Sequence, residues 1–135
     1  MALKIALKPQ EKIIIGGAVL QNGKSRSEFI VENSVPILRQ KDIMREEDAK
    51  TYCSKIYFAI QLMYIDDKNL IKYHKAYWEL IRDLVKAVPS TIAYVEKISS
   101  CLLKNDYYQA LKASKKLIEY EREVLKNVRT ANRSV

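Results

Sequence analysis

The stretch SVPILRQKDIMREEDAKTYCSKI, residues 34–56, contains the point at which the spacing of apolar residues changes. Before Arg39 the apolar residues follow the short period of β-strands, whereas beyond Asp42 they recur every three or four positions, as on one face of an α-helix. This change predicts an α+β fold with two parts. Residues 1–42 are expected to form a small antiparallel β module, and residues 43–135 an antiparallel bundle of three to four helices.

Short apolar runs predict five strands in the β module, at residues 3–7, 11–15, 18–21, 28–33 and 35–39. The first strand alternates Leu3, Ile5 and Leu7 on one face. It stops before Pro9, which has no N–H to donate to a β-ladder. We therefore expect this strand to be short and to lie at a sheet edge.

Two glycine-containing turns separate the middle strands. Gly16 and Gly17 follow a β-branched run and are expected to form a bulge or a tight turn. Asn22-Gly23 lies between two apolar runs, which is the strongest short-range signal of a type I′ hairpin. This signal predicts that the strand before Asn22 pairs with the strand after it.

Helical periodicity predicts a first helix at residues 46–65. The positions expected on its buried face are Ala49, Cys53, Ile56, Ile60 and Met63. Its first turn would carry Glu46, Glu47 and Asp48, whose carboxylates complement the positive end of a helix dipole. We therefore interpret this acidic run as structural, not as a metal or acid–base site.

Three more helices are predicted from apolar stripes and capping residues. The second should end before Pro89, the third should be capped by Ser90 or Thr91, and the fourth by Asn105 or Asp106. The stripe expected in the second helix is Ile71, His74, Trp78, Ile81 and Val85. The positions expected in the third and fourth helices are Ile92, Val95, Ile98, Cys101, Leu102, Leu111, Ser114, Ile118, Leu125 and Val128.

The charge balance favours an acidic partner. Twenty-four Lys and Arg against sixteen Asp and Glu give a net charge of +8, which suits nucleic acid or an anionic surface. The first 42 residues hold seven basic and four acidic residues and are the more basic part per residue. No apolar run approaches the ~20 residues that cross a bilayer, and no signal-peptide pattern is present, so we expect a cytoplasmic protein with no membrane partner.

Residues that carry chemistry are sparse. Cys53 and Cys101 lack CxxC spacing and a neighbouring histidine, so they are expected to be reduced thiols without a metal. The one histidine, His74, lies within a predicted helix, and no glycine-rich phosphate loop is present. The sequence therefore predicts a protein that is not an enzyme and that needs no cofactor.

Basic residues gather around the edges of the predicted β module. They are Lys4, Lys8, Lys24, Arg26, Arg39 and Lys41. If the first and last strands lie side by side, Arg39, Lys4 and Lys8 would form one basic edge that suits RNA, because arginine offers a planar fork to phosphate or to a base edge. The alternative is that Arg39 pairs with an acidic residue of the module, Glu11, Glu28 or Glu32, and only closes the sheet. The residues alone do not choose between the two.

Four segments between Leu3 and Asp66 resemble, in order and spacing, the signature segments of the FlbT family of flagellum-biogenesis regulators. They are LKPQEKIIIGGAV, NGKSR, ENSVPILRQKDI and KIYFAIQLMYID. Members of that family are described as associating with the 5′ untranslated region of flagellin mRNA and promoting its degradation. The resemblance implies an RNA-binding repressor of flagellin synthesis.

LKPQEKIIIG and SVPILRQKDI are also similar to the first and last strand segments of the small carbon storage regulator proteins, which bind GGA-containing loops in mRNA leaders. In that family the RNA surface is made by these two strands, and the arginine of the last strand is a principal contact. That arginine falls on Arg39 here. Ile5 would match an apolar contact of the first strand, and Lys8 a nearby basic one.

The resulting prediction is a post-transcriptional repressor whose β module binds a flagellin mRNA leader. Arg39, Lys8, Lys4, Ile5, Lys41, Lys24 and Arg26 are the candidate contacts. The helical bundle would support the sheet and offer a surface to a flagellar or regulatory protein, and the number of copies that associate stays open. The alternative function is a protein-interaction module that affects flagellin mRNA indirectly.

Overall fold

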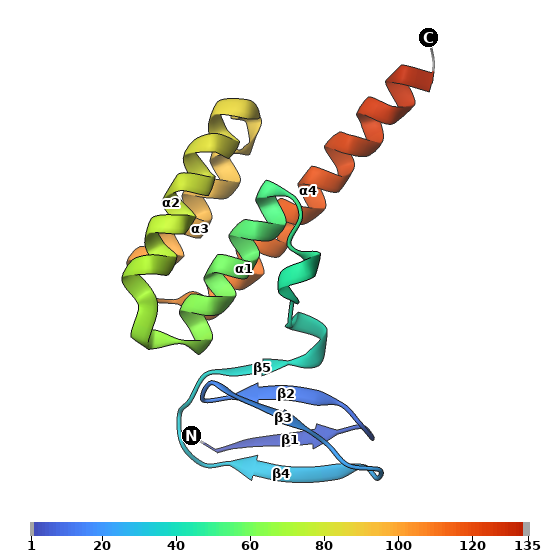
Figure 1. Ribbon diagram of the computed structural model, residues 1–135, viewed down its shortest axis with the longest axis vertical. Helices are drawn as coiled ribbons and strands as arrows, with labels where there is room; N and C mark the ends of the chain where they lie inside the picture. The colour runs from blue at the N-terminus through green and yellow to red at the C-terminus, as the bar shows by residue number, and fades with distance from the viewer. Residues whose placement is uncertain (1, 134–135) are drawn as a thin grey trace. The chain divides into compact units, whose positions relative to one another are not determined.

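The computed structural model describes residues 2–133, with side chains as far as Asn127 in the last helix (Figure 1). Its internal contacts divide the chain into a β unit that ends at Ile43 and a helical unit that begins at Met44. The β unit contains the strands and one short 3-10 helix, and the described part of the second unit contains only helices and their connections. The predicted α+β class is confirmed.

Five short strands form the β unit: β1 (Leu3–Leu7), β2 (Lys12–Ile15), β3 (Ala18–Gln21), β4 (Ser27–Val31) and β5 (Ile37–Arg39). They make two antiparallel sheets, one of β1 and β4 and one in the order β3–β2–β5 (Figure 1). A short 3-10 helix, η1 (Gln40–Asp42), follows β5 directly.

The first and last strands are not hydrogen-bonded neighbours. β1 pairs with β4, with Ile5 opposite Phe29, and β5 pairs with β2, with Leu38 opposite Ile14. The turn after β2 places β3 along one edge of that strand, so β5 pairs with the other edge. Any contact between β1 and β5 must therefore come from side chains.

The core of the β unit lies between the inner faces of the two sheets. Ile5, Leu7 and Ile13 are buried there. The side chains packed against them are Ile15, Phe29, Val31 and Ile37. The predicted alternation in β1 is confirmed for Ile5 and Leu7, whereas Leu3 at the strand end is 51% exposed. The core is small, so each polar tie at its edges matters to the stability of this unit.

The Gly16-Gly17 turn forms as predicted. Both residues have positive φ, +57° and +86°, and they connect β2 directly to β3 in a two-residue hairpin. Left-handed conformation at both central residues is what a type I′ hairpin requires and what glycine adopts without steric cost.

The hairpin predicted at Asn22-Gly23 is wrong. Neither residue has positive φ, and the strands on either side belong to different sheets. The Asn22 side chain instead donates to the carbonyl oxygens of Leu7, Lys8 and Ser25 at 3.3, 2.8 and 3.0 Å. Its own carbonyl accepts from the Ser27 hydroxyl at 2.8 Å. The side chain thus fastens the crossing between the sheets, and this side-chain network outweighs the local turn preference.

Asn22→Asp should destabilise the β unit, because a carboxylate would face carbonyl oxygens that now accept hydrogen bonds from an amide. We expect the free energy of opening of β1 and β4, measured by native-state amide hydrogen exchange, to fall by about 1–3 kcal/mol. Asn33→Asp is the matched control, since Asn33 is exposed and lies outside any strand. Equal exchange rates in the two variants would contradict the assigned role.

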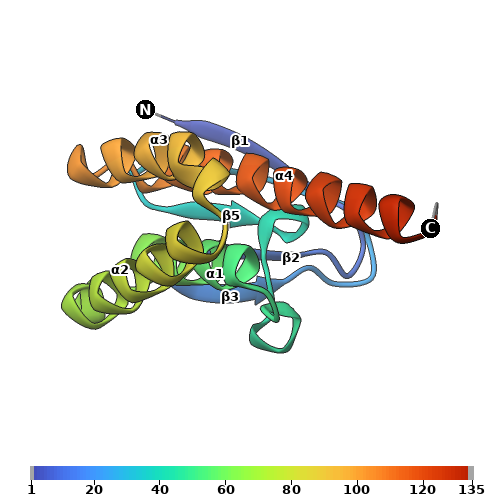
Figure 2. The same ribbon diagram turned by 90° about the horizontal axis from the view of Figure 1, so that it is seen from above.

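The helical unit has four α-helices: α1 (Tyr52–Ile65), α2 (Leu70–Ala87), α3 (Ile92–Leu103) and α4 (Tyr107–Arg133). Figure 2 shows α1 beside α2 and α3 beside α4, and α1 also packs against α4. Among the fully buried large side chains are Ile56, Ile60, Met63, Tyr77, Ile98 and Leu117. In the part of the chain that the structure describes, none of these helices is both long and apolar enough to span a membrane.

The first helix starts later than predicted. α1 begins at Tyr52, and Thr51 forms a capping box with Ser54, each side chain accepting from the other's backbone N–H. The acidic residues 46–48 form a separate 3-10 helix before it. Arg45 pairs with two of them, Glu47 at 3.3 Å and Asp48 at 3.0 Å. The prediction that these carboxylates occupy the first turn of α1 is therefore wrong, because the Thr-Ser cap fixes the helix start.

The buried face of α2 is rotated from the predicted stripe. Ile81 is buried as predicted, but Ile71 is 89% and Trp78 48% exposed, whereas Tyr77 is fully buried. The Tyr77 hydroxyl lies 2.9 Å from the Ser99 hydroxyl of α3, so this buried polar group has a hydrogen-bond partner. The predicted helix end before Pro89 is confirmed.

Of the N-caps predicted for the last two helices, the one for α4 forms and the one at Thr91 for α3 does not. Asp106 caps α4 by accepting from the Gln109 N–H at 3.1 Å, as predicted. Thr91 does not cap α3, because its hydroxyl donates back to the Val88 carbonyl at 2.7 Å. In α4, Leu125 is 46% exposed instead of buried, and the side chain of Val128 lies outside the described residues.

Candidate functional site

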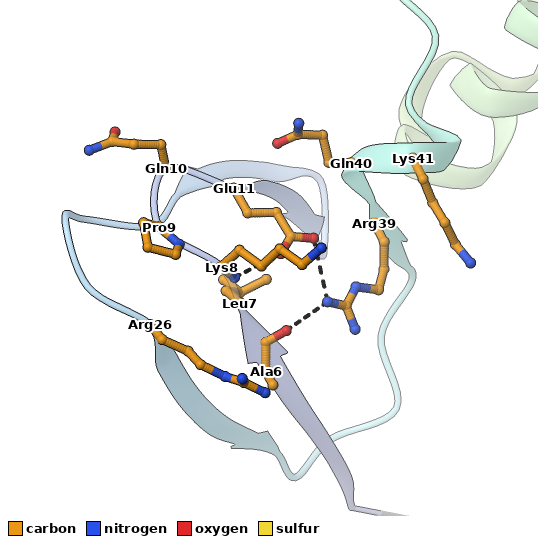
Figure 3. Close-up of a pocket in the computed structure, with 10 residues that line it drawn as sticks. All are labelled: Ala6, Leu7, Lys8, Pro9, Gln10, Glu11, Arg26, Arg39, Gln40 and Lys41. Atoms are coloured by element: carbon orange, nitrogen blue, oxygen red, sulfur yellow. Dashed lines mark hydrogen bonds and ion pairs between the residues drawn. The ribbon is translucent and has the colours of Figure 1, made fainter.

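A surface hollow of about 740 Å³ lies in the β unit, where β1 ends and β5 leads into η1 (Figure 3). It is lined by Ala6, Leu7, Lys8, Pro9, Gln10, Glu11, Arg26, Arg39, Gln40 and Lys41. Four of these ten residues are basic and one is acidic. We call this feature the basic hollow.

The turn between β1 and β2 forms one wall of the basic hollow. The Glu11 N–H donates to the Lys8 carbonyl at 3.1 Å, which closes a four-residue turn with Pro9 at its second position. Gln10 follows with φ of +64°, the left-handed conformation that the third position of a type II turn requires. The Gln10 N–H is held by the Gly23 carbonyl at 2.9 Å. A residue other than glycine is therefore kept in a strained conformation beside the candidate site.

Arg39 forms the opposite wall and links the two sheets. Side chains alternate along β5, so Arg39 lies on the same face as Ile37, toward the core between the sheets. Leu38, which is 1% exposed, lies on the opposite face. The Arg39 Nη2 donates to the carbonyl oxygen of Ala6 in β1 at 2.7 Å. The same nitrogen lies 3.4 Å from a Glu11 carboxylate oxygen. The ion-pair alternative for Arg39 is thus confirmed for Glu11, while 39% of the Arg39 side chain stays exposed to the hollow.

Glu11 is held at the centre of the basic hollow (Figure 3). Its Oε1 accepts from the Lys8 backbone N–H at 2.9 Å. This bond, together with the neighbouring Arg39 guanidinium and the Lys8 charge, lowers the pKa of Glu11, although partial desolvation opposes the shift. The carboxylate is therefore ionised at neutral pH and offsets one of the surrounding positive charges.

The remaining cations leave the hollow positively charged. Lys8, Arg26 and Lys41 are exposed. Figure 3 shows the Lys8 side chain extending toward Glu11 and Arg39, Lys41 lying beside Arg39, and Arg26 directed toward Ala6. A concave surface with a net positive charge attracts anions more strongly than the same charges on a flat surface. The arrangement is suited to binding an anion.

The other predicted contacts lie outside the basic hollow. Lys4 is on the outer face of the β1–β4 sheet, 3.5 Å from Glu28, and Lys24 is exposed in the connection between β3 and β4. Ile5 is 2% exposed and belongs to the core. We therefore leave these three residues out of the candidate site.

Two glutamines that were not predicted from the sequence, Gln10 and Gln40, also line the hollow. The Gln40 side chain accepts from the Lys12 N–H at 2.6 Å and so ties η1 to β2. Gln10 is positioned by the turn at Pro9, and proline at the second position of a turn was the signal that could have revealed it. No sequence signal marks Gln40, because its partner is 28 residues away.

The described residues show no arrangement for metal or thiol chemistry. Between residues 2 and 133 no three His, Cys, Asp or Glu side chains are placed to hold a metal ion. Cys53 and Cys101 are free thiols, and burial, with a smaller effect of Glu121, raises the pKa of Cys53 to about 12. The Cys53 thiol is therefore protonated at neutral pH and is a poor nucleophile.

The fold and the basic hollow define an α+β protein in which a small β unit with a basic surface hollow precedes a unit whose described residues form helices and their connections. A family model described as flagellar protein FlbT matches residues 3–125. The chain belongs to the FlbT family.

Curated relatives match nearly the whole chain. A protein of Bradyrhizobium diazoefficiens named probable flagellum biosynthesis repressor protein FlbT 1 is 43% identical over 92% of this chain and 85% of its own length. A protein of Rhodopseudomonas palustris named probable flagellum biosynthesis repressor protein FlbT is 38% identical over 93% of this chain and 98% of its own length. The flagellum biosynthesis repressor protein FlbT of Caulobacter vibrioides is 36% identical over 95% of this chain and 92% of its own length. No solved structure matches the chain.

Arg39→Ala should weaken the connection between the two sheets, because the Ala6 carbonyl loses its charged donor. We expect the opening free energy of β1, measured by amide hydrogen exchange, to fall by about 1–2 kcal/mol. Lys41→Ala, which removes an exposed cation from the same hollow, should change it by less than about 0.5 kcal/mol. If both variants exchange like the unmodified protein, Arg39 does not hold the sheets together.

Gln10→Gly should stabilise the β unit, because glycine adopts positive φ without the steric cost that glutamine bears. The expected gain in opening free energy is roughly 0.5–1 kcal/mol after the larger entropy of the unfolded glycine chain is subtracted. Asn105→Gly is the matched control in the helical unit, where φ is +58°. Asparagine tolerates this conformation better, so its gain should be smaller, and a loss of stability in Gln10→Gly would argue against strain at the turn.

Proposed function

We propose that this protein represses flagellin synthesis by binding the 5′ untranslated region of flagellin mRNA, which promotes degradation of the message or blocks its translation. The repressor role is supported by the names of the curated relatives. The single observation that supports RNA binding is the basic hollow, where Lys8, Arg26, Arg39 and Lys41 surround one carboxylate. The similarity to carbon storage regulators stays a prediction.

The chemistry of the hollow suits an RNA strand. Arg26 and Arg39 offer planar guanidinium groups to phosphate oxygens or base edges, and Lys8 and Lys41 add point charges. The two glutamine side chains, Gln10 and Gln40, bring amide groups of the kind that read base edges. Occupation of a leader would exclude the ribosome or expose the message to a nuclease, so the mechanism requires no catalysis by this chain.

A second candidate function is binding of a flagellar or regulatory protein through the helical unit. A hollow of about 380 Å³ lies between the start of α1, the end of α2 and the middle of α4. Leu84, Val88 and Val124 line it, and Tyr52 and Leu125 at its side are 45% and 46% exposed. Exposed apolar side chains around a hollow are typical of a protein-binding surface.

The salt dependence of RNA binding tests the proposal. We expect purified protein to bind a flagellin leader transcript with a log–log salt slope of about −0.7 for each neutralised phosphate. The double variant Lys8→Gln, Lys41→Gln should make the slope shallower by about 1.4, because two phosphate contacts are lost. Both lysines are exposed, so the variant leaves the sheets intact, which Arg39→Ala would not.

Lys86→Gln, Lys97→Gln is the matched control, with the same change of charge on exposed residues of α2 and α3. An equal change of slope in both double variants would mean that net charge, not the basic hollow, determines binding. If the unmodified protein shows no salt-sensitive binding to the leader, direct RNA binding fails and the protein-binding function takes its place.

A further inference from the structure

The position of the Glu11 carboxylate indicates what the basic hollow is built to hold. Glu11 is the one acidic residue among the ten that line it. Each of its oxygens has a partner, Oε1 the Lys8 N–H at 2.9 Å and Oε2 the Arg39 Nη2 at 3.4 Å. A backbone N–H and a guanidinium that converge on two oxygens of one anion are the donors that phosphate groups use in proteins.

Both contacts of the Glu11 carboxylate, with the Lys8 N–H and with Arg39, can be exchanged without moving Arg39. The Arg39 Nη2 is 2.7 Å from the Ala6 carbonyl but 3.4 Å from the Glu11 carboxylate, so the bond to the backbone is the shorter one. Arg39 would therefore keep its position if Glu11 turned away. Glu11, whose side chain is 17% exposed, is also not part of the apolar core, so turning it away leaves the core contacts between the sheets in place.

We propose that Glu11 is a built-in competitor, which occupies the place of a backbone phosphodiester group until a nucleic-acid strand displaces it. The displaced carboxylate frees the Lys8 N–H and one Nη2–H of the Arg39 guanidinium, and the phosphate accepts from both. The role of RNA in this proposal rests on the proposed function, whereas the phosphate site follows from the geometry of Lys8, Glu11 and Arg39.

Displacement has a consequence for selectivity. A small free anion gains the two donors but must replace a carboxylate attached to the same chain, which is present at high effective concentration. A strand places further phosphates near Arg26, Lys41 and the Lys8 ammonium at the same time, and these contacts favour the exchange. Glu11 therefore lowers the affinity for single phosphates and leaves an advantage to ligands that carry several.

The direct test uses dimethyl phosphate, a monoanionic phosphodiester, in an NMR titration of the full-length protein. We expect it to shift the Lys8 amide and Arg39 guanidinium signals, with roughly two- to fivefold tighter binding to Glu11→Gln than to the unmodified protein. Glutamine keeps an oxygen that can accept from the Lys8 N–H but lacks the charge. Glu28→Gln, at an exposed carboxylate outside the hollow, should bind like the unmodified protein.

The inference is overturned if Glu11→Gln binds dimethyl phosphate no more tightly than the unmodified protein, or if the shifts arise away from Lys8 and Arg39. A second measurement needs no variant. Since the Lys8 N–H and Arg39 lower the pKa of Glu11, saturation with dimethyl phosphate should raise it toward its ordinary value, as followed by the carboxyl carbon signal. An unchanged Glu11 pKa would show that the carboxylate is not displaced.

A leader-binding measurement separates this inference from the proposed function. Tighter binding of the transcript by Glu11→Gln, with no change in Glu28→Gln, supports both direct RNA binding and the competitor role of Glu11. If the leader binds and Glu11→Gln does not alter its affinity, the competitor role fails and RNA binding stands. If neither the unmodified protein nor the two variants bind the leader while the dimethyl phosphate titration behaves as expected, RNA binding fails and the phosphate site stands.

Discussion

The hydrogen bond from the Arg39 guanidinium to the Ala6 carbonyl is the constraint on which the β unit depends. The two sheets share no backbone ladder, and the core between them is small. The bond, at 2.7 Å, joins Arg39, the last residue of β5 in one sheet, to Ala6 of β1 in the other. An arginine is suited to this position because its long stem spans the distance while its charge remains at the water-facing rim. Its structural and binding roles thus use the same guanidinium.

Sequence patterns predicted the features that depend on local spacing. The alternation in β1, the Gly16-Gly17 turn and the change to helical periodicity each require only neighbouring residues, and each is observed. The errors arose where a distant partner decides. Asn22 donates to the carbonyl of Leu7, fifteen residues earlier in β1, and the buried Tyr77 hydroxyl shares a hydrogen bond with the Ser99 hydroxyl of α3. Neither partner can be found by reading a window of the chain.

The candidate site divides in the same way. The sequence predicted six basic residues around the edges of the β unit. Four of them, Lys8, Arg26, Arg39 and Lys41, line one hollow. Which of the six belonged together could not be predicted, because that depends on the two-sheet topology that separates β1 from β5. Glu11 could be foreseen only as one of three carboxylates near Arg39. Its central place follows from the turn at Pro9, which brings it back over the Lys8 N–H.

The three hydrogen bonds of the Asn22 amide also bear on the chemical lifetime of the protein. Asparagine followed by glycine deamidates readily, because the glycine N–H is unhindered and attacks the side-chain carbonyl while ammonia departs. Here the departing nitrogen is held by the carbonyls of Leu7, Lys8 and Ser25, and the carbonyl oxygen by Ser27. The folded β unit therefore protects Asn22, and each opening of the unit exposes it. The rate of deamidation at Asn22 is consequently set by how often the two sheets come apart.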